Sequence, residues 1–160
     1  MNVQPDIELW GKMRQEFEGL RLKAYKDSGS VWTCGFGTTY LYDKARKVQE
    51  GDTITREDAD RYMAYDSAEV IRQLNLYIKK PLNTAQSTAI ADYFYNRGAG
   101  NFLKTELDEL INANPNDPRI LDEIRKTGLW DRLGNMMNGL VRRRKSEAFL
   151  YQTGLLRFKF

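Results

Sequence analysis

Residues 18–37, EGLRLKAYKDSGSVWTCGFG, mark the point where a helical pattern gives way to a strand pattern. Before them, apolar side chains recur at helical spacing. These side chains are Ile7, Trp10, Met13 and Phe17. Asp6 is placed to cap the start of this helix and Gly19 to end it. Glu18 then projects from the margin of the apolar stripe, where a carboxyl group is anchored by the core and still reaches a cleft.

After Gly19, apolar and polar residues alternate over residues 20–25, which predicts a strand. Residues 27–30, DSGS, have turn chemistry, and residues 31–37 are predicted to return as a second strand. One face of that strand, the expected core face, carries Trp32, Cys34 and Phe36, and the other carries Thr33, Gly35 and Gly37. Because two glycines leave the backbone beside Thr33 nearly bare, we expect a flat polymer such as a sugar chain to approach there. Glu18, Asp27 and Thr33 are therefore predicted to converge on one cleft wall.

Two carboxyl groups and a hydroxyl are the groups that glycoside hydrolysis needs. One carboxylic acid protonates the leaving oxygen, and a second, ionised carboxylate activates water or attacks the sugar carbon. A hydroxyl beside the second carboxylate can hold the water in line. We interpret Glu18, Asp27 and Thr33 as this set. Taken singly, each has a structural interpretation as well: a solvated charge at a helix end, a turn former and a strand residue, respectively.

The composition excludes several other kinds of chemistry. The chain has 160 residues, 41% of them hydrophobic and 12% aromatic, which is enough for one domain with a real core. It contains no histidine, which excludes Ser-His-Asp and Cys-His catalysis and histidine metal sites. The single cysteine, Cys34, excludes an internal disulfide and is expected in the core. The sequence has no oxygen-ligand metal motif, so we expect neither a metal nor a cofactor.

The rest of the chain reads as helical, apart from residues 39–51, which we expect to complete the small sheet. Thr55 and Asp58 form a capping-box pattern that opens a helix of about 23 residues, ended by Pro81. At roughly 34 Å this helix is long enough to bridge two lobes. Thr84 is predicted to cap the next helix, which is apolar nearly all round. The predicted later elements are that helix at 84–97, a tight connection at 98–102, and helices at 105–111, 118–126 and 139–152.

One motif near the N-terminus is specific enough to indicate a family. Glutamate, eight residues, aspartate, five residues and threonine, set within EGLRLKAYKD and followed by TCGFG, resembles the phage-type lysozymes, glycoside hydrolase family 24. The resemblance assigns the catalytic roles to Glu18, Asp27 and Thr33. It also places Thr38 where many members carry a histidine that supports the substrate cleft.

The resemblance also implies the fold. The expected class is α+β and lysozyme-like, with a small antiparallel β-sheet lobe and a larger helical lobe joined by a long helix, and the active-site cleft between them. It implies a single domain over residues 1–160. The N-terminal lobe is expected at about 15–65, and the helical lobe at about 66–160 together with the first helix.

Two further segments carry the resemblance in weaker form. DYFYNRGAGNF, followed by Thr105, is similar to the family's central helix and the turn after it. This implies that Tyr95 and Thr105 contact glycan, although Tyr95 reads equally well as a core aromatic. GLVRRRKSEAF is similar to the family's last long helix. There the resemblance implies that one arginine of residues 142–144 turns into the cleft and pairs with Glu18, and the alternative is a solvated helix face.

The motif and the resemblance predict a muramidase that hydrolyses the β-1,4 bond between N-acetylmuramic acid and N-acetylglucosamine in peptidoglycan. Glu18 is the expected general acid, and Asp27, aided by Thr33, the base that activates water. Inversion is implied, and a retaining course with Asp27 as nucleophile stays open. The alternative is a non-catalytic module that binds glycan or nucleic acid. Because 22 acidic residues nearly balance 25 basic ones, with a net charge of +3, we expect no nucleic-acid partner.

The N-terminal stretch, MNVQPDIELWGKMRQEFEG, lacks the basic and apolar regions of a signal peptide. No stretch of the sequence approaches the ~20 apolar residues of a spanning helix. We therefore expect no membrane segment and a protein made in the host cytoplasm. Family members of this kind wait there until a holin permeabilises the membrane, so the resemblance implies holin-dependent release onto the cell wall. We expect the enzyme to be a monomer.

Overall fold

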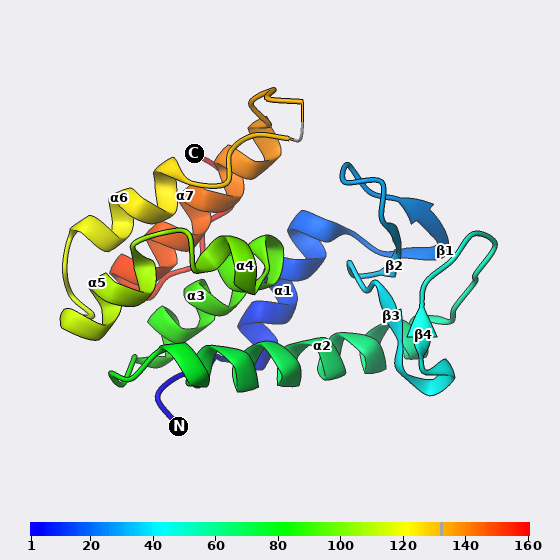
Figure 1. Cartoon of the computed structure of the whole chain (residues 1–160), viewed down its shortest axis with the longest axis horizontal. Helices are drawn as coiled ribbons and strands as arrows, with labels where there is room; N and C mark the ends of the chain where they lie inside the picture. The colour runs from blue at the N-terminus through cyan, green and yellow to red at the C-terminus, as the bar shows by residue number, and fades with distance from the viewer. Residues whose placement is uncertain (132) are drawn as a thin grey trace.

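Helix α3 (Thr84–Arg97) lies at the centre of the helical part of the molecule (Figure 1). The computed structural model describes residues 1–131 and 133–160. The other helices are α1 (Ile7–Glu18), α2 (Arg56–Tyr77), α4 (Ala99–Phe102), α5 (Leu107–Ala113), α6 (Arg119–Lys126) and α7 (Asn138–Thr153), with a 3₁₀ turn η1 (Tyr42–Lys44). Four of them, α1, α2, α4 and α7, pack against α3. Every residue of α3 from Gln86 to Phe94 is buried, which confirms the predicted central helix.

The long helix predicted after Thr55 is α2, which runs from the helical part of the molecule to the strands (Figure 1). Its capping box is confirmed, because Thr55 and Asp58 each accept the other's backbone N–H through their side chains, both at 3.0 Å. The 22 residues of α2 span roughly 33 Å. Neither α2 nor another helix of the described residues is both long and apolar enough to cross a bilayer.

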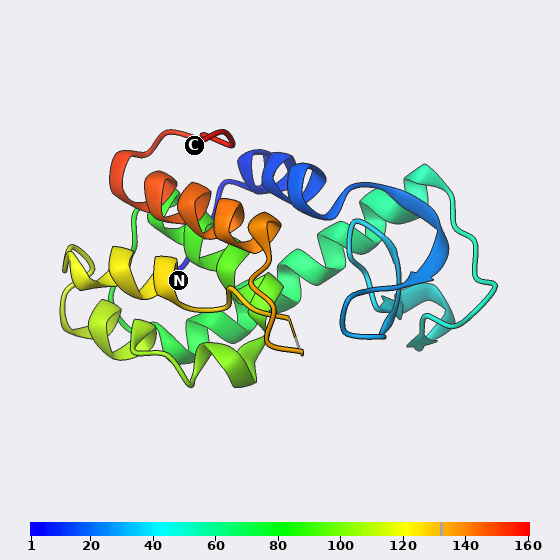
Figure 2. The ribbon, with the colours of Figure 1, turned by 90° about the horizontal axis from the view of Figure 1, so that it is seen from above.

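The strands form two small antiparallel sheets near the N-terminal end of α2 (Figure 2). The predicted hairpin is confirmed: β1 (Arg21–Lys26) pairs with β2 (Trp32–Gly35). The prediction that residues 39–51 complete the same sheet was wrong. Instead, β3 (Tyr40–Leu41) pairs with β4 (Arg46–Lys47) in a sheet of its own, because the chain turns back through η1 directly after β3.

Buried apolar side chains form two groups, one at each end of α2. The larger group fills the helical part and includes Trp10 and Leu74, both fully buried. The smaller group lies under the strands and includes Cys34 and Tyr62. The predicted core position of Cys34 is confirmed, and burial raises the pKa of its thiol to about 11. Because α2 contributes Leu74 to one group and Tyr62 to the other, it ties the two ends of the molecule together.

Helix α1 begins and ends as predicted, but its apolar stripe is shorter. The Asp6 side chain accepts the N–H of Leu9 at 2.9 Å, and Gly19 has a φ of 67°, which glycine adopts without strain. Trp10 is fully buried, whereas Ile7 is 51% exposed, so the prediction that Ile7 belongs to the core stripe was wrong. The residue that enters the core at this end is Val3, which precedes the helix and is fully buried.

Several boundaries in the helical part differ from the predicted ones. Asn83, not Thr84, caps α3, because the Asn83 side chain accepts the N–H of Gln86 at 2.8 Å. Residues 98–102 were predicted to be a connection, but they contain the helical turn α4. Helix α5 begins at Leu107 rather than at residue 105. The predicted last two helices correspond closely to α6 and α7.

Candidate active site

A hollow of about 520 Å³ lies where the β1–β2 hairpin faces the helical part of the molecule. Its lining comes from segments far apart in the sequence: the end of α1, the hairpin turn, the end of α3 and the start of α7 with the loop before it. The lining residues on which the argument below depends are Glu18, Asp27, Trp130 and Arg143. The two carboxyl groups predicted from the motif therefore line one cleft.

Glu18 occupies the cleft because it is the last residue of α1, directly before the glycine at which the chain turns into β1. Its side chain is 21% exposed, and its Oε1 accepts a hydrogen bond from Arg143 Nη1 at 2.5 Å. Arg143 is therefore the arginine of α7 that was expected to turn into the cleft. On another side of Glu18 stands Gly37, where an added Cβ would lie 3.3 Å from the Glu18 Cδ. The lack of a side chain at residue 37 leaves room for the Glu18 carboxyl group.

Asp27 is held by its own turn. Its Oδ1 accepts the backbone N–H groups of Gly29 at 2.8 Å and of Val31 at 2.9 Å, as an aspartate does when it starts a tight turn. No described residue donates a hydrogen bond to Oδ2, so this oxygen is available to a ligand or to water. The turn thus fixes the position of the carboxylate and leaves one oxygen for chemistry.

Thr33 lies behind the cleft surface rather than on it. Its side chain is 3% exposed, and its hydroxyl donates to the carbonyl of Val31 at 3.0 Å. The backbone N–H of Val31 donates to Asp27, so Thr33 and Asp27 are both hydrogen-bonded to Val31 and do not contact each other directly. The predicted bare floor beside Thr33 was wrong. An added Cβ at Gly35 would lie 3.4 Å from the Ala59 Cβ, because the first turns of α2 pack against β2.

The three residues predicted to bind substrate, Thr38, Tyr95 and Thr105, all have partners within the fold. The Thr38 hydroxyl donates to Asp66 at 2.6 Å, and the side chain is 1% exposed. The Tyr95 hydroxyl donates to the carbonyl of Phe36 at 3.2 Å and is close to Gly37. The Thr105 hydroxyl donates to the Phe102 carbonyl at 2.6 Å, before the start of α5. None of the three is among the residues that line the cleft.

Tyr95 is nevertheless close to the site, beneath Glu18. The guanidinium of Arg14 lies over its ring at 3.9 Å from the centroid. Burial raises the pKa of the Tyr95 hydroxyl well above its ordinary value, so it stays neutral. Tyr95 is partly buried and packs against the larger apolar group, which agrees with its interpretation as a core aromatic residue.

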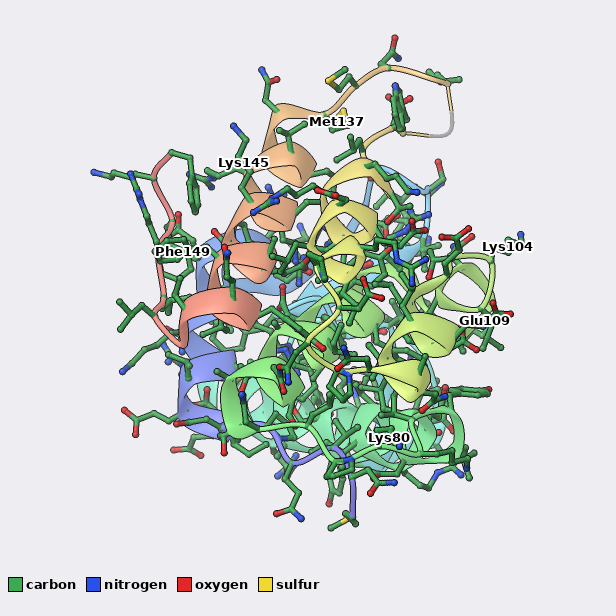
Figure 3. The ribbon with its side chains drawn as sticks, turned by 90° about the vertical axis from the view of Figure 1, so that its left-hand side faces the viewer. Lys80, Lys104, Glu109, Met137, Lys145 and Phe149 are labelled. Carbon is green, nitrogen blue, oxygen red and sulfur yellow. The ribbon has the colours of Figure 1, made fainter. Side chains whose placement is uncertain are left out.

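A group of buried charges between α3 and α7 was not predicted from the sequence. Arg143 donates from Nε and Nη2 to the two oxygens of Asp92, at 2.8 and 2.9 Å. Arg144 pairs with Glu147 at 2.8 Å, and all these side chains are nearly or fully inaccessible to solvent. Lys145 and Phe149 lie on the outer side of α7 (Figure 3). The opposite face of α7, which carries the unpredicted buried charges, turns inward. The feature of the sequence from which this group could have been predicted is Asp92, an acidic residue in an otherwise apolar stretch of α3.

The arrangement is suited to acid–base hydrolysis. One carboxyl group is placed beside a guanidinium at a helix end, and a second lies across the same cleft on a turn, so the two can act on one bond from two sides. Trp130, 48% exposed, adds an aromatic surface to the cleft of the kind on which sugar rings pack. Within residues 1–131 and 133–160, no three cysteine, aspartate or glutamate side chains are grouped to hold a metal ion.

Comparison with known proteins agrees with this geometry. Residues 15–147 match the family model described as phage lysozyme. The chain is 30% identical over 144 residues to an endolysin of Acyrthosiphon pisum secondary endosymbiont phage 1, covering 87% of this chain and 92% of that protein. It is 31% identical over 134 residues to the endolysin of Salmonella phage P22, covering 84% and 88%.

Among solved structures, an endolysin from Escherichia coli O157:H7 phage FAHEc1 is similar with a TM-score of 0.84 and 26% identity over 98% of both chains. A point mutant of P22 lysozyme is similar with a TM-score of 0.73 and 27% identity, covering 96% of this chain and 99% of that one. These structures confirm the predicted lysozyme-like α+β fold. The chain therefore belongs to the phage lysozyme family, glycoside hydrolases of the endolysin type that act on peptidoglycan and lyse the bacterial cell wall.

Proposed function

We propose that this enzyme is a muramidase that hydrolyses the β-1,4 bond between N-acetylmuramic acid and N-acetylglucosamine. Glu18 protonates the leaving oxygen, and Asp27 activates a water molecule on the opposite face of the sugar. The observation that carries the proposal is that the Glu18 and Asp27 carboxyl groups line the same cleft from α1 and from the hairpin turn. Thr33 supports Asp27 indirectly, since both side chains bind Val31.

The surroundings of the two carboxyl groups suit their different roles. Asp27 accepts two backbone N–H groups at one carboxylate oxygen, which fixes its position and leaves the other oxygen to bind a water molecule. Glu18 is 21% exposed and lines the cleft beside Phe17, so its carboxyl group can reach a glycosidic oxygen bound there. We propose an inverting course, in which water is bound between the two carboxyl groups.

The first experiment replaces Glu18 by glutamine, with Glu16→Gln as the matched control. Glu16 is on the same helix but pairs with the exposed Arg142 at 3.4 Å. Glu18→Gln should keep the melting temperature and the binding to purified cell wall, and should lose at least about 10²-fold in the rate of wall hydrolysis. Glu16→Gln should hydrolyse at the wild-type rate. Full lysis by Glu18→Gln would reject the acid role.

The second experiment identifies the bond and its stereochemistry. Mass spectrometry of the muropeptides released from purified peptidoglycan separates hydrolysis, which adds water, from transglycosylation, which leaves an anhydro sugar. NMR of the first product anomer separates inversion from retention. Anhydro products would overturn the hydrolytic proposal, and a retained anomer would make Asp27 the nucleophile instead of the base.

We also propose that residues 1–160 act as one domain and as a monomer, and that the enzyme stays in the host cytoplasm until a holin opens the membrane. The proposal follows the family members that the motif resembles. Some relatives carry a different name, SAR-endolysin, for example that of Enterobacteria phage P21. Fractionating cells that produce the enzyme with and without a holin tests the proposed location and release, and gel filtration tests the proposed monomer. Lysis without a holin would overturn it.

A further inference from the structure

The guanidinium of Arg143 is shared between two carboxyl groups. Its Nε and Nη2 edge binds both oxygens of Asp92, at 2.8 and 2.9 Å, and its remaining nitrogen, Nη1, binds Glu18 at 2.5 Å. A bidentate pair of this kind fixes the plane of a guanidinium, because two parallel hydrogen bonds leave it no rotation. The direction in which Nη1 points at Glu18 is therefore set by Asp92.

Asp92 itself has no access to a glycan. It lies in the middle of α3, is 0% exposed, and is not part of the cleft lining. The other buried carboxyl group nearby, that of Glu147, is 3.6 Å from Arg143 but 2.8 Å from Arg144, so it pairs with Arg144. Asp92 is thus the buried partner that neutralises Arg143.

We propose that Asp92 is a positioning residue for the general acid: it holds Arg143 in the plane that meets Glu18, and its negative charge offsets the charge that Arg143 presents to the Glu18 carboxyl group. The inference rests on the proposed role of Glu18. An uncompensated guanidinium in contact with the Glu18 carboxyl would favour the ionised form, which cannot protonate a leaving group. The buried aspartate opposes that effect.

The other titratable groups around Glu18 do not take over the electrostatic effect of Arg143 and Asp92. Tyr25 faces it from β1 and Tyr95 from α3, and burial raises the pKa of each, so both are neutral in the working range. Asp27 faces it across the cleft. Arg142, the neighbour of Arg143 on α7, is engaged with Glu16.

Asp92 keeps its charge over the same range. Burial, the largest single effect, raises the pKa of its carboxyl group, but Arg143, Glu147 and Arg144 together outweigh burial and hold the pKa below its usual value. Replacing Asp92 by asparagine keeps the shape and removes one buried charge close to Glu18. By Coulomb's law at the effective dielectric of protein sites, a charge at this range moves a proton equilibrium by on the order of one pH unit.

The test compares the pH dependence of peptidoglycan hydrolysis by the wild type, Asp92→Asn, and the double variant Asp92→Asn/Arg143→Gln. In Asp92→Asn the alkaline limb of kcat should move to lower pH by about one unit, while KM stays near the wild-type value. In the double variant, which removes both charges, the limb should return toward the wild-type position. Glu16→Gln is the matched control, and it should leave the limb in place because its charge is exposed and screened.

The outcomes separate this inference from the proposed function. If all variants keep the wild-type limb and differ only in melting temperature, Asp92 is structural and the inference is overturned, while the function stands. If Glu18→Gln still hydrolyses peptidoglycan, the function itself fails. Should Asp92→Asn unfold at the assay temperature, Arg143→Gln is compared with the double variant, because these two differ only in the charge of residue 92. The limb of Arg143→Gln should lie at higher pH than that of the double variant, and coincident limbs would overturn the inference.

Discussion

Replacing Asp66 by alanine removes the carboxylate that ties the strand region to the helices. Asp66 lies on α2 and accepts hydrogen bonds from the hydroxyls of Thr38 at 2.6 Å and Tyr42 at 2.8 Å. It also pairs with Arg14 of α1 at 3.3 Å, and the Arg14 side chain is 0% exposed. Without Asp66 this guanidinium stays buried beside Met63 with no anionic partner.

The size of the effect follows from that burial. Breaking a buried ion pair on one side costs about 3–5 kcal/mol, because the remaining charge cannot return to water. For a chain of this length each kcal/mol lowers the melting temperature by about 2–4 °C, so we expect a loss of roughly 6–20 °C for Asp66→Ala at pH 7. Asp60→Ala is the matched control, since the Arg56–Asp60 pair is about half exposed, and it should cost less than about 1 kcal/mol. Urea unfolding at 25 °C measures both free energies.

A second background checks the reasoning. With Arg14→Met in place, the buried charge is gone, and Asp66→Ala should cost far less than in the wild-type chain. If Asp66→Ala costs no more than Asp60→Ala, or costs the same in both backgrounds, the buried charge does not dominate. The role assigned to Asp66 would then be refuted.

Two other changes test the site and the pH response. Gly37→Ala should lower hydrolysis about tenfold or more at a temperature where the protein stays folded, because a methyl group there would lie 3.3 Å from the Glu18 Cδ at a φ of +92°. Gly51→Ala, with a φ of +84° and open space around it, is the control in the same rate assay. The hydrogen-bonded Arg46 holds the pKa of Asp52 well below its usual value, so Asp52 stabilises the fold above about pH 4 and this contribution is lost as the pH falls further. The melting temperature of Asp52→Asn should therefore fall less than that of the wild type between about pH 5 and pH 2.

Local signals were enough to predict the elements that position the two carboxyl groups. The cap at Asp6 and the turn at Gly19 are encoded within a few residues, so the place of Glu18 at the end of α1 followed from the sequence. The same holds for Asp27, whose own turn provides its hydrogen bonds. The bare floor that was predicted on the other face of β2 was wrong for a different reason. What covers Gly35 is α2, which begins about twenty residues later, and period-two alternation carries no information about such a neighbour.

The spacing of charged residues in α7 predicts which of its arginines are buried, but not which one contacts Glu18. Glu147 follows Arg143 by four residues and Arg144 by three, the spacings at which side chains share a helix face, whereas Arg142 is five residues away. Arg143 and Arg144 are accordingly buried with Glu147, and Arg142 is exposed. The spacing thus separates the two buried arginines from the exposed one, but it cannot say which of the two reaches Glu18.

That choice depends on Asp92, a residue on another helix. A single aspartate in the buried stretch of α3 is costly unless a cation meets it, so its presence implies a buried partner from a neighbouring element. Of the two buried arginines, Arg143 lies where one guanidinium can bind Asp92 and Glu18 together. A lone acid in a central apolar helix, together with an arginine-rich last helix, is therefore a pattern from which a charge-paired catalytic glutamate can be predicted, provided that the packing of the two helices is known.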